Sequence, residues 1–137
     1  MSIPKNNFEV LIVDDDDMTV FLHQVYVKEN EFHLEPKSFY NGKDAVEYFE
    51  TYFNVNKHYC VLLDINMPIL NGWEFMDHII EKGMSKNVSV IILTSSINTA
   101  DREKAKKYDL VIDYIEKPLS AEYLSQLKST DKMKEYF

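Results

Sequence analysis

Cysteine is almost absent from this sequence, which also has only three glycines and four prolines in 137 residues. The single cysteine, Cys60, excludes an internal disulfide and a CxxC metal site. Because it begins an apolar run, it is interpreted as a buried, unreactive thiol. No apolar run approaches the roughly 20 residues of a membrane span, and the polar residues 1–7 do not have the pattern of a signal peptide. We therefore expect a cytoplasmic protein that does not insert into a membrane.

Positive charge is scarce as well. Fifteen Lys and Arg residues stand against 23 Asp and Glu residues, which gives a formal net charge of -8. This balance disfavours direct binding to nucleic acid, which needs a basic surface, but it is compatible with a bound divalent cation. The hydrophobic share of 45% and the length suit one domain with a real core. We expect a single domain over residues 1–137, with a polar lead-in at 1–7 and a C-terminal extension of the last helix at 129–137.

Strand-like and helix-like segments alternate along the chain. Apolar runs predict five strands, at Phe8–Val13, Phe32–Phe39, Tyr59–Leu63, Ser89–Leu93 and Leu110–Ile115. Apolar residues at helical spacing predict five helices, at about 17–29, 45–53, 72–82, 99–107 and 119–128. Repeated strand–helix units call for one parallel sheet that is covered by helices on both faces, with right-handed crossovers. The sequence therefore predicts an α/β fold.

Three of these elements have individual features. Pro36 points to an edge position for the second strand, because proline cannot donate to a sheet ladder. The first helix is expected to have one apolar face made of Met18, Phe21, Leu22 and Val25, after a cap at Asp16 or Asp17. The fourth helix has little apolar surface, which indicates a loosely held helix whose position can shift.

Polar residues follow four of the predicted strands. Asp14 and Asp15 follow the first strand, Asp64 the third, Thr94 the fourth and Lys117 the fifth. Ligands bind at the carboxyl ends of the strands in open parallel sheets, so we expect these side chains to converge. Neighbouring carboxylates repel each other and persist where a cation compensates them. An all-oxygen set of three aspartates and one backbone carbonyl suits Mg²⁺.

This set of groups has the chemistry that an anionic phosphoryl group requires. The cation and the Lys117 ammonium would neutralise the charge that develops on the phosphoryl oxygens, and the Thr94 hydroxyl would orient them. The carboxylate of Asp64 would be the nucleophile and would form an acyl phosphate.

The sequence resembles the receiver domains of two-component response regulators over essentially the whole chain. The motifs that carry the resemblance are Leu11–Asp15, Leu62–Pro68, Asn71-Gly72, Ile92–Ser95 and Tyr114–Pro118. Each motif is weak alone, but all five in this order are highly specific. The resemblance implies a doubly wound, five-stranded (βα)5 sheet of the flavodoxin-like type, with strand order 2-1-3-4-5.

The resemblance also implies a role for each matching residue. Asp64 matches the aspartate that accepts a phosphoryl group from a phosphohistidine on a sensor histidine kinase or a histidine phosphotransfer protein. Asp14 and Asp15 match the acidic pair that holds Mg²⁺, and Asn66 matches the residue whose main-chain carbonyl completes the site. Thr94 and Tyr114 match the switch residues. Lys117 matches the lysine that pairs with the phosphoryl group, and its bond to Pro118 is expected to be cis.

The family resemblance implies a signalling protein rather than an enzyme. Phosphorylation would reshape the surface of the fourth helix, fifth strand and fifth helix. Because the chain ends about where the fifth helix does, a stand-alone receiver is expected, which passes its signal to a downstream protein partner or a further phosphotransfer step.

Two alternatives stay open at this point. Asp15-x-Asp17-x-Thr19 fits the first motif of haloacid-dehalogenase-type phosphatases, with Asp15 as nucleophile, although Asp64 would then have no role. The second alternative is a receiver-like binding module that is never phosphorylated. The histidines have no metal-ligand spacing and are interpreted as ordinary surface or core residues; they are His23, His33, His58 and His78.

Overall fold

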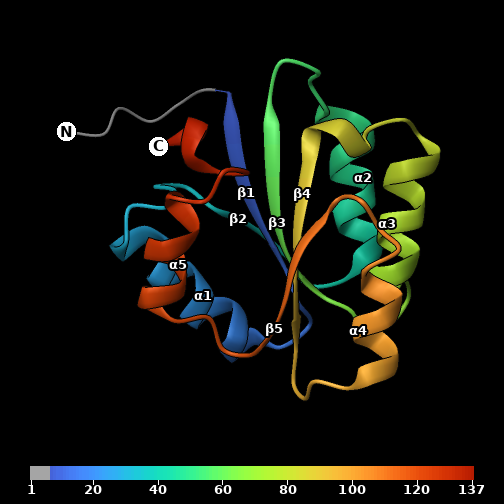
Figure 1. Ribbon diagram of the computed structural model, residues 1–137. Helices are drawn as coiled ribbons and strands as arrows, with labels where there is room; N and C mark the ends of the chain where they lie inside the picture. The colour runs from blue at the N-terminus through green and yellow to red at the C-terminus, as the bar shows by residue number, and fades with distance from the viewer. Residues whose placement is uncertain (1–6) are drawn as a thin grey trace.

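Five parallel strands form a single sheet in the order β2-β1-β3-β4-β5 (Figure 1). The computed structural model describes residues 7–137, so the lead-in expected at residues 1–7 lies, apart from Asn7, outside the described residues. The strands are β1 (Phe8–Val13), β2 (Lys37–Phe39), β3 (His58–Asp64), β4 (Val88–Thr94) and β5 (Val111–Glu116). The predicted α/β fold with this strand order is confirmed.

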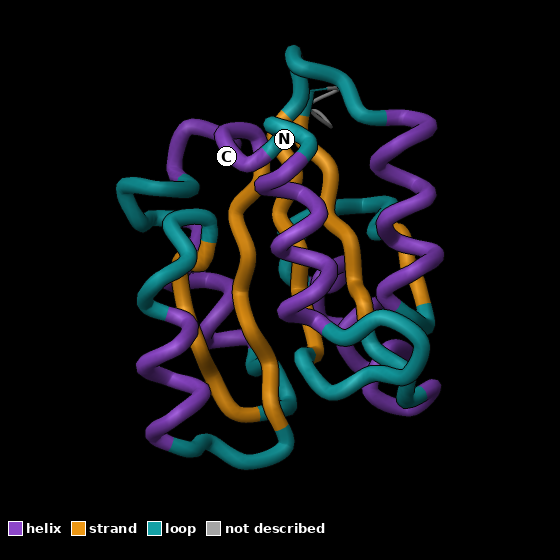
Figure 2. The backbone as a smooth tube through the Cα atoms, turned by 90° about the vertical axis from the view of Figure 1, so that its right-hand side faces the viewer, coloured by secondary structure: helices purple, strands orange, loops and turns teal. Residues whose placement is uncertain are grey.

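Helices cover both faces of the sheet (Figures 1 and 2). They are α1 (Asp17–Glu29), α2 (Gly42–Tyr52), α3 (Gly72–Glu81), α4 (Thr99–Ala105) and α5 (Ala121–Lys128), with short 3₁₀ turns η1 (Ser85–Asn87) and η2 (Lys134–Tyr136). Side chains alternate along each strand, so the sheet has two apolar faces. One face packs with α2, α3 and α4, and the other packs with α1 and α5. None of the helices described for residues 7–137 has the length and apolar character needed to span a lipid bilayer.

The second strand is shorter than predicted. It begins only at Lys37, and the segment between α1 and this strand starts with a turn. Glu31 takes a positive φ of 54° at this turn, and the Phe32 N–H donates to the Val27 carbonyl at 2.9 Å. Phe32 is buried in the α1–α5 half of the core, so its apolar character serves the end of α1 and not the sheet. The prediction of strand at Phe32–Pro36 was therefore wrong.

Half of the apolar face expected on α1 is exposed, whereas its other members, Leu22 and Val25, are half-buried. Met18 is 67% exposed and Phe21 is 60% exposed, whereas Val20, His23 and Val27 are buried. The buried residues also have helical spacing, and Val20 and Val27 pack into the α1–α5 half of the core. The exposed stripe of Met18, Phe21 and the half-buried Leu22 is called the α1 stripe below.

The last two helices are also shorter than predicted. Only Ala105 of α4 is buried, and the helix ends there instead of continuing to residue 107. This agrees with the prediction of a loosely held helix. Ser120 caps α5 by accepting the Tyr123 N–H at 3.0 Å, so this helix begins at Ala121 and not at Leu119.

The C-terminal tail does not extend α5. After Lys128 the chain leaves the helix and reaches the amino ends of β1 and β3 (Figure 1). Met133 is fully buried there, and the Tyr136 ring stacks on Phe8 at 4.9 Å and on His58 at 4.8 Å between centroids. The tail therefore closes the α1–α5 half of the core.

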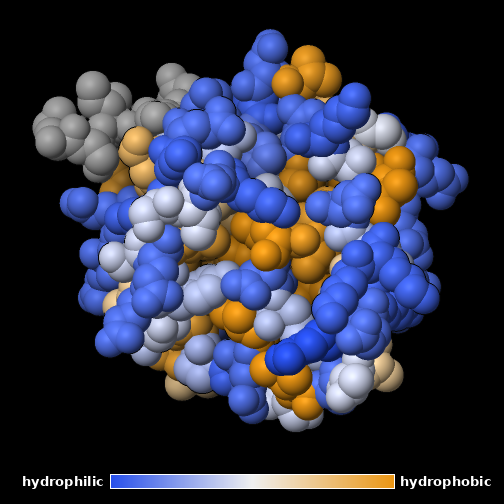
Figure 3. All heavy atoms as spheres, viewed as in Figure 1, coloured by the Kyte–Doolittle hydropathy of each residue, from blue (hydrophilic) through white to orange (hydrophobic). Residues whose placement is uncertain are grey.

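Strand β5 forms one edge of the sheet, between α4 and α5. Figure 3 shows apolar side chains in a depression at the centre of this face, ringed by polar ones. On the α4 side the depression is a hollow of about 420 Å³, lined by Arg102, Ala105, Lys106, Val111, Ile112, Asp113 and Tyr114. This surface is called the β5 hollow below.

Candidate functional site

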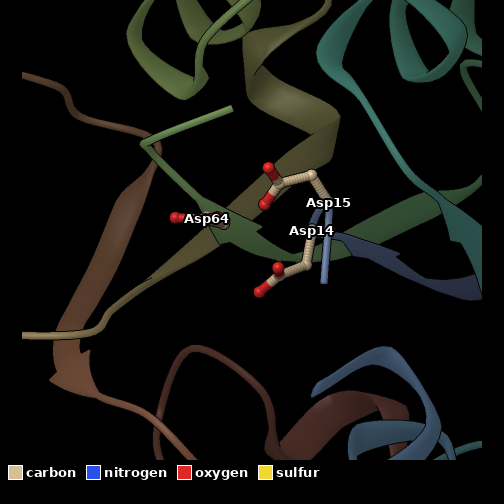
Figure 4. A group of neighbouring side chains, drawn as sticks. All are labelled: Asp14, Asp15 and Asp64. Atoms are coloured by element: carbon tan, nitrogen blue, oxygen red, sulfur yellow. The ribbon is translucent and has the colours of Figure 1, made fainter. Parts of the chain in front are cut away.

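The carboxyl ends of β1 and β3 bring three carboxylates together, as predicted (Figure 4). Asp14 and Asp15 follow β1, and Asp64 is the last residue of β3. Each can place one carboxylate oxygen within 4.8 Å of the others. Asp14 and Asp64 are 1% and 4% exposed, whereas Asp15 is open to solvent.

Backbone N–H groups hold the two buried carboxylates in place. The Asp16 N–H donates to Asp14 Oδ1 at 3.0 Å, and the Asn66 N–H donates to Asp64 Oδ1 at 3.0 Å. In both loops the residue two positions later supplies the donor, which is typical of an Asx turn. The second oxygen of each carboxylate is left for other partners.

Lys117 supplies the positive charge of the site. Its Nζ lies 2.8 Å from Asp14 Oδ2 and 3.4 Å from Asp64 Oδ2. Burial acts to lower the pKa of Lys117, but the two carboxylates outweigh burial and raise the pKa above its ordinary value. The Lys117 N–H donates to the Thr94 carbonyl at 2.8 Å, which fixes the lysine to the end of β4. The Lys117–Pro118 peptide is cis, as expected.

One lysine does not balance three carboxylates. Burial raises the pKa of Asp64 above its ordinary value, and the neighbouring Asp14 charge raises it further. A hard divalent cation would compensate this excess negative charge, and the donor set consists of oxygen atoms alone. The residues therefore fit Mg²⁺, held by Asp14, Asp15 and Asp64.

The acids lie at a hollow that opens to solvent. Its volume is about 470 Å³, and its lining residues are Asp15, Asp16, Thr19, Leu22, Asp64, Asn66, Ser95, Lys117 and Pro118. The hollow therefore joins all the strand ends of the site to the first turns of α1. Asn66 also lines this hollow, and the role expected for its main-chain carbonyl as a metal ligand stays a prediction.

The two expected switch residues, Thr94 at the end of β4 and Tyr114 on β5, have hydrogen-bond partners other than the acids in this conformation. The hydroxyl of Thr94, which is 2% exposed, donates to the Ser96 carbonyl at 3.0 Å. Tyr114 is half-buried on β5, and its hydroxyl accepts the Asn98 N–H at 3.4 Å. Both residues are thus tied to the loop that leads from β4 into α4.

Gly72 is required by close packing behind Asp64. A Cβ atom at this position would lie 2.6 Å from the Ile65 Cα and 2.8 Å from the Asp64 carbonyl oxygen. The Gly72 N–H also donates to the Ile65 carbonyl at 3.1 Å. Glycine therefore lets the start of α3 pack closely against Asp64 and Ile65 at the end of β3.

One polar residue near the site was not singled out from the sequence. His23 on α1 is fully buried, and its Nε2 accepts the Leu119 N–H at 3.2 Å. Leu119 comes two residues after Lys117, so the histidine contacts the loop that carries the lysine. The helical spacing of Val20, His23 and Val27 was the available signal for its burial.

The phosphatase motif is not arranged as a second site. Asp17 opens α1 at the surface, and Thr19 on the same turn gives both its N–H and its hydroxyl to Asp16 Oδ2. Asp15 shares its surroundings with Asp14 and Asp64. Asp15 therefore joins the acidic cluster, while Asp17 and Thr19 belong to the first turn of α1, which Asp16 caps.

Comparison with known proteins gives a consistent picture. The family model described as "Response regulator receiver domain" matches residues 10–128. The transcriptional regulatory protein SrrA of Staphylococcus aureus is 30% identical over 82% of this chain, which spans only 42% of the length of SrrA.

Two solved structures are similar over most of their length. A two-component response regulator from Cytophaga hutchinsonii superposes with a TM-score of 0.80 at 31% identity, over 90% of this chain and 95% of that one. The CheX-CheY-BeF3-Mg+2 complex from Borrelia burgdorferi contains a chain with a TM-score of 0.74 and 28% identity, over 89% of this chain and 87% of that one.

Proposed function

The chain belongs to the family of response regulator receiver domains, and from this premise we propose that it accepts a phosphoryl group on Asp64 in a magnesium-dependent reaction. Receiver domains interact with histidine kinases or histidine phosphotransfer proteins, and the proposed donor is a phosphohistidine on such a protein. The observation that carries the proposal is the placement of the buried Asp64 carboxylate, 3.4 Å from Lys117 and beside two further acids.

The proposed reaction is a single phosphoryl transfer. An Asp64 carboxylate oxygen attacks the phosphorus atom, the P–N bond to the donor imidazole breaks, and the imidazole leaves with the bonding electrons. The Lys117 ammonium, which already lies beside Asp64 Oδ2, pairs with the oxygens of the transferred group. Mg²⁺ held by Asp14, Asp15 and Asp64 would neutralise charge on those oxygens. The Asn66 N–H holds Asp64 Oδ1 and so orients the nucleophile.

The similar Borrelia structure supports the choice of ligands. Its name records BeF3 and Mg+2 with a CheY chain. The acidic cluster of this chain offers three carboxylates, which are oxygen ligands of the kind that Mg²⁺ prefers.

The donor protein is proposed to dock on the α1 stripe. Leu22 belongs both to this stripe and to the lining of the hollow that contains Asp64. A donor that covers Met18 and Phe21 therefore brings its own residues to the mouth of the hollow. Exposed apolar side chains of this size mark interaction surfaces when they lie together.

Phosphorylation is proposed to act on the β5 hollow through Thr94 and Tyr114. A phosphoryl group on Asp64 offers new acceptors for the Thr94 hydroxyl, which in this conformation bonds to Ser96. Movement of that hydroxyl would loosen the loop whose Asn98 N–H bonds to Tyr114. Since α4 is held by little apolar contact, the loop and the helix form a two-state element that local charge can bias. A downstream protein would read the resulting shape of the β5 hollow.

Intact-mass measurement tests the proposed reaction. The protein is incubated with acetyl phosphate as a small phosphodonor, with Mg²⁺ or with EDTA, beside Asp64→Asn. We expect one added phosphoryl group in the wild type with Mg²⁺ and none in the other samples. No adduct on the wild type, together with no binding of beryllium fluoride, would refute the proposal and favour a binding module that is never phosphorylated.

A further inference from the structure

The loop that carries Lys117 is anchored from two sides. On one side the Lys117 N–H donates to the Thr94 carbonyl at 2.8 Å. On the other side the Leu119 N–H donates to His23 Nε2 at 3.2 Å, across 96 residues of sequence. The first anchor comes from β4 and the second from α1, so hydrogen bonds from two different elements fix the backbone on either side of Pro118.

The second anchor is unusual because a side chain makes it inside the core. His23 is 0% exposed, and its neighbours on the buried face of α1 are the apolar Val20 and Val27. Leu119 is 1% exposed, so water does not replace a lost acceptor easily. A buried N–H without an acceptor is costly, and the loop would have to move to satisfy it.

The hydrogen bond also determines the protonation of the ring. A nitrogen that accepts an N–H carries no proton, so the proton of neutral His23 lies on Nδ1. Within residues 7–137, Nδ1 has no hydrogen-bond partner. Of the two ring nitrogens, therefore, only Nε2 forms a hydrogen bond within residues 7–137, and that bond is to the loop that carries Lys117.

We propose that His23 is a positioning residue for phosphoryl acceptance: as the Nδ1–H tautomer it accepts the Leu119 N–H and thereby keeps the Lys117 ammonium beside Asp64. This inference rests on the proposed function. His23 touches neither the phosphoryl group nor the reacting atoms, and it acts only through the loop. The backbone from Leu119 back to Lys117 is short, so a shift at one end moves the Nζ atom at the other. Burial supports the neutral ring, since it lowers the pKa of His23 to about 4.

Three variants separate positioning from simple packing. His23→Leu puts an apolar side chain of similar size in the core but removes the acceptor of the Leu119 N–H. His23→Gln restores an acceptor oxygen. Val27→Ala is the matched control, because it weakens the same buried face of α1 but leaves the acceptor of the Leu119 N–H in place.

The kinetic readout is the dependence of phosphorylation rate on acetyl phosphate concentration, with Mg²⁺, alongside the melting temperature of each protein. We expect His23→Leu to lower the maximal rate about tenfold, because displaced catalytic groups lose about this much or more, and His23→Gln to recover most of it. Val27→Ala is expected to melt at a lower temperature and to keep the wild-type rate. A wild-type rate in His23→Leu, or an equal loss in Val27→Ala, would overturn the inference.

A second readout uses the wild-type protein alone. Long-range ¹H–¹⁵N spectra of the histidine rings report the tautomer near neutral pH. We expect a protonated Nδ1 for His23, and a protonated Nε2 would overturn the inference even if His23→Leu does not fold. A wild type that takes up no phosphoryl group would refute the proposed function, whereas a phosphorylated wild type with an unaffected His23→Leu would refute only the role of His23.

Discussion

Replacing Asp64 by asparagine should stabilise the protein when no divalent cation is present. The substitution removes one buried negative charge and keeps the shape of the side chain. Its amide oxygen can still accept the Asn66 N–H that Asp64 Oδ1 accepts at 3.0 Å. Lys117 keeps its closer partner, Asp14, at 2.8 Å.

The size of the effect follows from opposing charge terms. At an effective dielectric of about 20, Asp14 and Asp64 oxygens within 4.8 Å repel by at least about 3.5 kcal/mol, while Lys117 at 3.4 Å attracts Asp64 by about 5 kcal/mol. The exposed Asp15 adds a weaker repulsion, so the total repulsion on Asp64 nearly equals the attraction by Lys117. Removal of the desolvation cost of a carboxylate that is 4% exposed then decides the sign. We expect a gain of about 1 kcal/mol in the free energy of unfolding, or about 4 °C in melting temperature.

Urea unfolding in EDTA and in Mg²⁺ checks this reasoning. Mg²⁺ at ten times its dissociation constant should stabilise the wild type by about 1.4 kcal/mol, and the variant by less, so the difference between them should shrink or reverse. Asp109→Asn, at an exposed position, is the control for a change of net charge. It should neither stabilise the protein in EDTA nor change the stabilisation by Mg²⁺. If Asp64→Asn is less stable than the wild type in EDTA, the buried charge of Asp64 does not destabilise the metal-free protein and the reasoning is refuted.

Three further predictions concern the surroundings of the acceptor. Lys117→Met should lower the free energy of unfolding in EDTA by about 3 kcal/mol, because it leaves two buried carboxylates without their cation; stability within about 1 kcal/mol of wild type in urea would contradict this. The pKa of His23 falls from 6.5 in the unfolded chain to about 4 in the fold, so the unfolded state binds the extra proton and stability must fall as pH drops below about 6.5. The wild type should lose about 2 kcal/mol between about pH 8 and pH 5 by this route, and His23→Leu should show a smaller slope in urea titrations; equal slopes would exclude His23 as the cause. Gly72→Ala should cost about 2–3 kcal/mol and slow phosphorylation, since its Cβ would meet the Ile65 Cα at 2.6 Å; unchanged stability and rate would show that this contact relaxes freely.

The site could be predicted because its chemistry lies in single residues at strand ends. Asp14, Asp64 and Lys117 each follow an apolar run, and the parallel topology alone brings such ends together. The structure confirms that these three side chains meet. Their roles in phosphoryl transfer remain proposals.

The orientation of α1 could not be predicted from the hydrophobic pattern. The helix has two faces with helical spacing, and the more apolar one, with Met18 and Phe21, lies in solvent. Sequence-based reasoning assumes that the most apolar face is buried. This assumption is wrong for a helix that keeps apolar side chains exposed, as α1 does in the α1 stripe. His23 was interpreted as an ordinary histidine because its hydrogen-bond partner, Leu119, is 96 residues away in the sequence.

The second strand shows a different limit. Phe32 and Pro36 lie in a stretch with strand-like composition, but Phe32 serves the core beneath α1. Local composition cannot distinguish a side chain that packs from a turn from one that packs from a strand. The three-residue β2 is defined by its pairing with β1, which is a tertiary property.

The most direct test of the central claim is to locate the phosphoryl group. The protein would be phosphorylated with acetyl phosphate and Mg²⁺, reduced with borohydride, which converts an aspartyl phosphate to homoserine, and mapped by peptide mass spectrometry. The account predicts homoserine at position 64 and at no other aspartate. Homoserine at position 15 would contradict it and would support the phosphatase chemistry, in which Asp15 is the nucleophile.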